Sequence, residues 1–188
     1  GRVELPTIID RANFYIEQGA SSLLMADSKG VATPEATRYF LNNVRAGLKE
    51  DVPIYYHAHD NFGTGTALAL AAATAGAWPQ ATVNGIADRG FAALEEVVMS
   101  LELLYGVHTG IDVKKLQRLS RTMERIIGIS NPPYKAITGD FVNIPSLVPG
   151  YIGALQGKGF LELEVMTPYE LELVGQRPQM VMTYNILC

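Results

Sequence analysis

The sequence of 188 residues contains a single cysteine, Cys188, which cannot form an intrachain disulfide. This suits a reducing compartment. Basic residues are also few, with 15 Lys and Arg against 19 Asp and Glu and a formal net charge of -4. A general affinity for nucleic acid or an anionic membrane requires a basic surface. We therefore expect small-molecule partners, no nucleic acid, no membrane and a cytoplasmic location.

Long apolar runs and nucleotide-binding fingerprints are absent as well. The longest run of small apolar residues, 67–77, is broken by Thr74 and Gly76 and is far shorter than the ~20 residues of a membrane span. No Gly-rich dinucleotide or phosphate loop follows an expected strand. What the chain does have is 48% hydrophobic residues, enough to form a sizeable core.

Helical and strand patterns alternate through the first 106 residues. Short continuous apolar strands separated by helices predict a parallel sheet with right-handed crossovers, so the expected fold class is α/β. The pattern fits either an open doubly wound sheet or part of a (β/α) barrel. The expected order is helix 6–18, strand 22–26, helix 34–49, strand 52–56, helix 64–75, strand 81–84 and helix 91–105.

Polar clusters follow each expected strand, and the most informative is His57-Ala58-His59-Asp60. Residues i and i+2 of a strand point to the same face, so both imidazoles can reach one divalent cation. The alternative is a pair of polar core residues whose hydrogen bonds are satisfied. Asp60 could likewise orient a histidine or accept hydrogen bonds from loop amides.

The pattern changes at Asp112, which can cap a helix whose one apolar face carries Val113, Leu116, Leu119, Met123, Ile126 and Ile127. Asn131-Pro132-Pro133 is expected to end this helix. Beyond residue 130, proline and glycine are frequent, which indicates a small separate subdomain. We therefore expect two domains, 1–110 and 111–188.

Several segments in a fixed order resemble one enzyme family. The set resembles the 2-isopropylmalate synthase and homocitrate synthase group of the pyruvate carboxyltransferase superfamily, which also contains HMG-CoA lyase. It covers residues 20 to 140. The matching segments are Ala26-Asp27-Ser28-Lys29-Gly30-Val31-Ala32-Thr33-Pro34-Glu35, His57-Ala58-His59-Asp60-Asn61-Phe62-Gly63, Thr82-Val83-Asn84-Gly85-Ile86-Ala87-Asp88-Arg89-Gly90, Ala92-Ala93-Leu94-Glu95-Glu96-Val97-Val98-Met99, Gly106-Val107-His108-Thr109-Gly110-Ile111-Asp112 and Pro132-Pro133-Tyr134-Lys135-Ala136-Ile137-Thr138-Gly139.

The resemblance implies a partial TIM-type barrel, namely the last three strands and their helices, followed by a small mainly helical subdomain. A complete barrel needs roughly 250 residues. The chain is therefore expected to be a fragment of a longer protein, with a partner chain supplying the missing wall as the alternative. By the same resemblance, the full-length protein is expected to be a homodimer.

The implied chemistry is the condensation of acetyl-CoA with a 2-oxo acid at a divalent metal, which can be zinc, manganese, cobalt or magnesium. Carried over by the resemblance, His57 and His59 are the metal ligands. Asp60 and Arg89 are the candidate catalytic residues, and Asn84 is a candidate cofactor-binding residue. Arg89 could instead pair with Asp88 or with a neighbouring helix.

The sequence departs from the family pattern in three places. The family's further Asn ligand is missing from Arg89-Gly90-Phe91-Ala92, the subdomain histidine is replaced by Ile152, and the first-strand Asp is not in this chain. A carbon-carbon lyase of the HMG-CoA lyase type, or another aldolase, is the first alternative, although 87–92 lacks the lyase cysteine. A catalytically degenerate binding or regulatory paralogue is the second.

Overall fold

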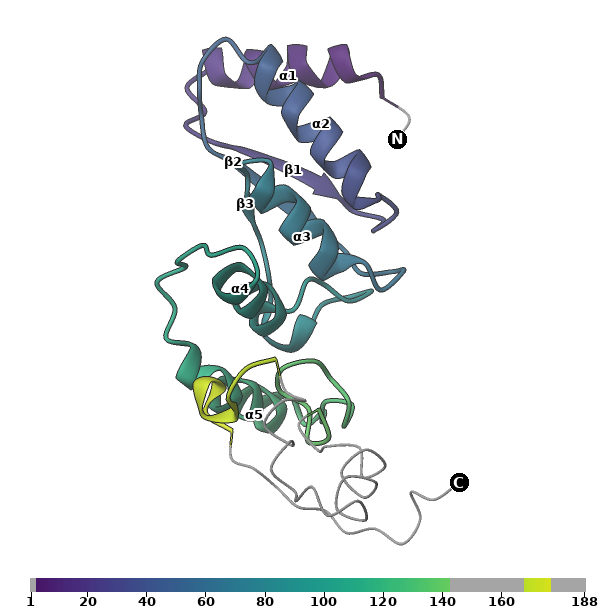
Figure 1. The fold of residues 1–188 in the computed structure, drawn as a ribbon. Helices are drawn as coiled ribbons and strands as arrows, with labels where there is room; N and C mark the ends of the chain where they lie inside the picture. Colours follow the sequence, from purple (N-terminus) through teal and green to yellow (C-terminus); the bar gives the residue numbers. More distant parts are fainter. Residues whose placement is uncertain (1–2, 143–167, 177–188) are drawn as a thin grey trace, which may run out of the picture. The chain divides into compact units, whose positions relative to one another are not determined.

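The computed structural model describes residues 3–142 and 168–176, and the chain divides into two compact units, Gly1–Thr109 and Gly110–Cys188 (Figure 1). In the first unit, helices and strands alternate and form a partial (β/α) barrel, which confirms the α/β class. Its elements are α1 (Leu5–Glu17), β1 (Leu23–Asp27), α2 (Pro34–Gly47), β2 (Ile54–Ala58), α3 (Gly65–Thr74), β3 (Trp78–Pro79), the 3₁₀ helix η1 (Val83–Gly85) and α4 (Leu94–Leu103).

The three strands form one parallel sheet in the order β1-β2-β3. The third strand lies earlier than the sequence pattern predicts, at Trp78–Pro79 rather than 81–84. The expected position was wrong because the chain turns into η1 there. Asn84 and Gly85 have φ values of 60° and 70°, in the left-handed region, which ends extended backbone.

One face of this sheet is covered by helices and the other is open. Side chains from α1, α2 and α3 pack against the face that carries Met25 and Tyr56, and together they form the main apolar core. On the opposite face, Leu24, Tyr55 and Trp78 are partners across the three strands, and Leu24 and Trp78 are 56% and 64% exposed. Because side chains alternate between the two faces along each strand, one face contributes to the apolar core and the other carries an exposed apolar row.

Local signals explain two of the helix starts. Thr33 caps α2 by accepting a hydrogen bond from the Ala36 amide, with Pro34 in the first turn. Helix α4 begins at Leu94, three residues later than expected, because Phe91 and Ala93 form bridges with His59 and Thr82. The backbone before α4 is therefore tied to the end of β2.

The described part of the second unit contains the 3₁₀ helix η2 (Val113–Lys115), α5 (Leu116–Ile127) and the 3₁₀ helix η4 (Leu171–Val174). Asp112 accepts a hydrogen bond from the Lys114 amide at 3.2 Å. Helix α5 ends at Gly128, whose φ is 71°, rather than at the expected Asn131. No helix among the described residues is both long and apolar enough to cross a bilayer.

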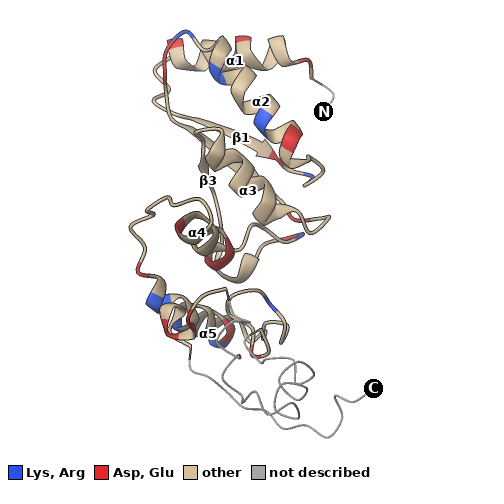
Figure 2. Ribbon diagram, viewed as in Figure 1, with Lys and Arg blue, Asp and Glu red and all other residues tan. Residues whose placement is uncertain are grey.

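The buried positions of α5 do not follow its apolar stripe. Leu116 is buried, but Ile126 is 73% exposed, whereas Ser120 and Glu124 are buried. Figure 2 shows acidic and basic residues together on α5, while the charged residues of α4 are all acidic. Helical periodicity gives the apolar stripe correctly, but it cannot show that a polar network occupies the inner face.

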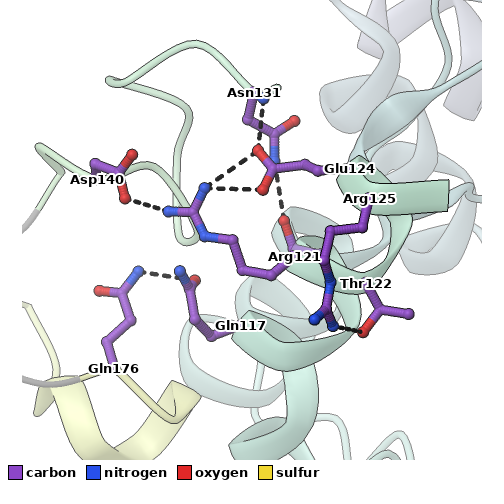
Figure 3. Close-up of polar contacts among 9 residues, drawn as sticks. Gln117, Arg121, Thr122, Glu124, Arg125, Asn131, Asp140 and Gln176 are labelled. Carbon is purple, nitrogen blue, oxygen red and sulfur yellow. Dashed lines mark hydrogen bonds and ion pairs between the residues drawn. The ribbon is translucent and has the colours of Figure 1, made fainter. Parts of the chain in front are cut away.

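This network joins α5 to the loop that follows it (Figure 3). Arg121 donates to both carboxylate oxygens of Glu124, at 3.1 and 2.9 Å, and also bonds Asp140. The Asn131 amide donates to Glu124 at 2.6 Å, and its side chain donates to Ser120 at 2.9 Å. Each charged group is therefore matched by a partner.

Candidate metal centre

The two histidines lie side by side at the carboxyl end of β2. His57 belongs to the strand and pairs with Ala26 of β1, two residues beyond the exposed Leu24–Tyr55 pair and on the same face of the sheet. His59 follows the strand in a bridge with Phe91 and is only 6% exposed. The Nε2 atoms of the two rings face each other at 3.4 Å.

The outer nitrogens of both rings are engaged. His57 Nδ1 lies 2.8 Å from the Gln80 Oε1 atom, and His59 Nδ1 lies 2.9 Å from the Asp88 carbonyl oxygen. Both oxygens accept hydrogen bonds, so each Nδ1 carries the hydrogen. In neutral imidazoles this leaves a lone pair on each Nε2. Two lone pairs cannot form a hydrogen bond with each other. The two Nε2 atoms are therefore both available as ligands to one cation between them.

The separation of these nitrogens fits one divalent cation. Two zinc–nitrogen bonds of ~2.0–2.1 Å at a tetrahedral angle place the nitrogens ~3.4 Å apart. The Nε2–Nε2 distance of 3.4 Å agrees with this. Within residues 3–142 and 168–176, no group of three or more His, Cys, Asp and Glu side chains is suited to hold a metal. The described chain thus offers a two-nitrogen site.

The surroundings of the rings hold them in place. The Phe91 ring is 4.4 Å from the His57 ring and 5.6 Å from the His59 ring, between centroids, and Phe91 is 5% exposed. The His59 amide donates to the Asp27 carbonyl at 3.3 Å. Gly30 has a φ of 57°, and a Cβ there would collide with the His59 carbonyl oxygen. Loops after β1 and β3 therefore fix His59.

Asp60 lies next to the pair but faces the start of α3. Its carboxylate accepts a hydrogen bond from the Gly65 amide, and its own amide donates to the Gly90 carbonyl at 3.2 Å. A Cβ on Gly65 or Gly90 would come within 2.9 or 3.1 Å of the Asp60 side chain. The two glycines leave room for Asp60, and its catalytic role stays a prediction.

Arg89 is connected to both neighbouring loops. Its Nε and Nη2 atoms donate to Asp88 Oδ2 at 3.1 and 2.8 Å, and Nη1 donates to the Ser28 carbonyl at 3.0 Å. Hydrogen bonding and charge from Arg89 lower the pKa of the Asp88 carboxyl. The Arg89 side chain is 48% exposed. Arg89 therefore joins the β1 loop to the residue that holds His59.

Asn84 lies in the turn after β3 and is joined to α4. Its amide donates to Glu95 Oε2 at 3.0 Å. Glu95, in the first turn of α4, is 2% exposed. Sequence reasoning missed Gln80, because the third strand was expected at 81–84 and Gln80 would precede it. Its place directly after a strand appears only in the structure, where β3 ends at Pro79.

The family comparison covers most of the chain. A family model described as HMGL-like matches residues 1–123. The homocitrate synthase AksA of Methanopyrus kandleri is 44% identical over 126 residues, covering 66% of this chain and 31% of that protein. The (R)-citramalate synthase CimA of Methanocaldococcus jannaschii is 33% identical over 167 residues, covering 87% of this chain and 32% of that protein. The chain thus spans about a third of these relatives.

Solved structures agree on the fold. The HMG-CoA lyase of Bacillus subtilis superposes with a TM-score of 0.61 at 25% identity, covering 69% of this chain and 46% of that chain. The carboxyl transferase domain of Rhizobium etli pyruvate carboxylase gives a TM-score of 0.60 at 24% identity, covering 67% and 21%. The parallel strands, the covering helices and the family match lead to one conclusion: the chain belongs to the HMGL-like family.

Proposed function

We propose that the full-length protein is a metal-dependent acyltransferase that condenses acetyl-CoA with a 2-oxo acid. The observation that carries the proposal is the convergence of the two Nε2 atoms at 3.4 Å, with both outer nitrogens engaged. The names of the relatives support the reaction class, since they are synthases of homocitrate, (R)-citramalate and 2-isopropylmalate.

Each site residue has a task in this proposal. A bound divalent cation supplies polarisation of the oxo-acid carbonyl. His57 and His59 hold it through Nε2, and Phe91 keeps water from one side of both rings. The half-exposed Arg89 guanidinium binds a substrate carboxylate, for which its planar donors are suited. Asp60 fixes the loop between β2 and α3, and Asn84 contacts acetyl-CoA.

The rest of the barrel belongs to the proposal as well. Leu24, Tyr55 and Trp78 form an apolar row on the open face of the sheet, which further barrel strands would cover. We assign 1–110 to the barrel and 111–188 to the subdomain that follows it, in a cytoplasmic homodimer. The segment 149–155, with Ile152 at the expected histidine position, lies outside the described residues.

A second candidate is a carbon-carbon lyase of the same family, favoured by the superposition on HMG-CoA lyase. The two reactions differ in what they consume. A synthase releases free CoA from acetyl-CoA only when a 2-oxo acid is present, whereas a lyase cleaves an acyl-CoA substrate without an oxo acid. A binding or regulatory paralogue does neither.

The test uses the full-length protein and its His57→Ala variant. Bound divalent metal is measured by elemental analysis, and CoA release from acetyl-CoA is measured against a panel of 2-oxo acids. His108→Ala is the matched control, because the His108 side chain is 87% exposed and pairs with Glu102. We expect His57→Ala to lose bound metal and at least about 100-fold of turnover, since it removes one of two nitrogen ligands.

The outcomes separate the candidates. Oxo-acid-dependent CoA release that disappears in His57→Ala and persists in His108→Ala supports the synthase. Metal binding with acyl-CoA cleavage alone supports the lyase, and loss of both bound metal and the two reactions supports the regulatory paralogue. If metal content and turnover survive His57→Ala, the assigned site is wrong.

A further inference from the structure

Gln80 holds a position from which one side chain controls the His57 ring. It follows β3 directly, and its amide donates to the Tyr56 carbonyl at 2.9 Å, which ties its backbone to β2. Its Oε1 atom lies 2.8 Å from His57 Nδ1. The contact therefore joins two neighbouring strands of the sheet, and its geometry is fixed by their pairing.

We propose that Gln80 is a positioning residue that sets the tautomer of His57 and so keeps its Nε2 atom available as a ligand. The inference rests on the proposed metal site and names the residue that prepares it. By accepting the Nδ1 hydrogen, Gln80 leaves the lone pair of His57 on Nε2, facing His59. A ligating histidine commonly has its second nitrogen held in this way.

Without the Gln80 acceptor, a competing arrangement is close at hand. His57 could then carry its hydrogen on Nε2 and donate it to His59 Nε2, which is only 3.4 Å away and has a lone pair. That hydrogen bond would occupy both ligand atoms at once. With Oε1 of Gln80 facing the ring, the contact excludes it, because a neutral imidazole carries one hydrogen and Nδ1 already holds it.

The two rings differ in what holds them. His59 Nδ1 donates to a main-chain carbonyl, that of Asp88, which no side-chain substitution removes directly. His57 depends on the side chain of Gln80. The pair is therefore controlled from one residue, and substitutions there can weaken the site without touching either ligand.

The experiment compares zinc affinity in the full-length protein by competition with a chromophoric chelator. Gln80→Met keeps the length of the side chain and removes the acceptor, whereas Gln80→Glu keeps an acceptor. We expect Gln80→Met to bind zinc about 10–100-fold more weakly and Gln80→Glu to retain the affinity of the unsubstituted protein. Gln18→Met, at an exposed position at the end of α1, is the control for the substitution itself.

A second readout needs no metal. Nitrogen chemical shifts of His57 in the metal-free protein, assigned by comparison with His57→Ala, report which ring nitrogen carries the hydrogen. We expect the Nδ1–H form in the unsubstituted protein and in Gln80→Glu, and an Nε2–H form in Gln80→Met. If Gln80→Met does not fold, Gln80→Ala gives the same comparison.

The outcomes distinguish this inference from the proposed function. If zinc binds and depends on His57, but Gln80→Met binds it equally well with His57 still in the Nδ1–H form, the role of Gln80 is overturned. If the unsubstituted protein binds no zinc, or binds zinc that His57→Ala does not remove, the proposed metal site is wrong. The His57 shifts in Gln80→Met then still decide whether Gln80 sets the tautomer.

Discussion

The two units each expose apolar side chains, but the interactions that stabilise each unit internally are different. In the first unit, the exposed row that contains Leu24 and Trp78 lies opposite a helix-covered apolar core. In the second, the exposed Ile126 lies on a helix whose buried residues include Ser120 and Glu124. Apolar burial therefore stabilises the first unit, while directional hydrogen bonds join α5 to its following loop.

The same contrast separates a structural polar cluster from a candidate site. Around Glu124, the Arg121 guanidinium and the Asn131 amide donate to carboxylate oxygens, so the donors and the acceptor satisfy one another. At His57 and His59 the outer nitrogens are engaged, but two acceptor atoms converge at 3.4 Å. A set of matched partners needs no ligand, whereas converging acceptors require a cation or a proton between them.

The largest expected effect tests whether the open face of the sheet is exposed to solvent in the full-length protein. Leu24→Lys in the full-length protein places an ammonium group on this face. If further barrel strands cover it, the unpaired charge is buried and the free energy of unfolding falls by about 3–5 kcal/mol. Urea denaturation followed by circular dichroism measures the change.

Tyr39→Lys is the matched control for Leu24→Lys. Tyr39 is 66% exposed on α2, so a lysine there is expected to change the stability by less than about 0.5 kcal/mol. If Leu24→Lys is as mild as this control, the face stays in water in the whole protein. The first unit would then resemble the second in leaving apolar side chains uncovered.

A smaller effect tests which face of α5 is internal. Leu116 is 2% exposed and Ile126 is 73% exposed. Leu116→Ala is expected to lower the free energy of unfolding by about 2–4 kcal/mol, because it creates a cavity. Ile126→Ala is expected to lower it by no more than about 0.5 kcal/mol. Equal losses in the two variants would show that the apolar side of α5 is buried in the full-length protein.

The sequence predicted the fold of the first unit well because its signals are local and repeated. Thr33 and Pro34 mark the start of α2, and short apolar runs mark β1 and β2. It misplaced β3, a strand of two residues that is set by pairing with β2. It gave the apolar stripe of α5 but not the burial of Glu124, because the partners of Glu124 are Arg121 and Asn131, and Asn131 lies beyond the end of the helix.

For the site, the sequence predicted the residues that spacing alone brings together. His57 and His59 are two residues apart on extended backbone, so their proximity follows from strand geometry. The contact between His57 and Gln80 joins residues 23 positions apart, and the burial of Glu95 depends on the turn at Asn84. Such contacts follow from tertiary packing, which periodicity does not encode.

The smallest expected effect is a pH dependence that belongs to the second unit. Burial by itself raises the pKa of the Glu124 carboxyl, but the Asn131 amide and the Arg121 guanidinium together outweigh it and hold the pKa below its ordinary value of 4.5. A carboxyl with a lower pKa in the folded state adds stability above its unfolded pKa and loses it as the pH falls through the folded pKa. The stability difference between the unsubstituted protein and Glu124→Gln should therefore be constant near neutral pH and shrink from pH 4.5 downward.

Glu50→Gln, at an exposed position, is the control and should show a much smaller difference throughout. Urea titrations at a series of pH values measure both differences, and a Glu124 difference that stays constant through this acid range would show that its hydrogen bonds do not favour the ionised form.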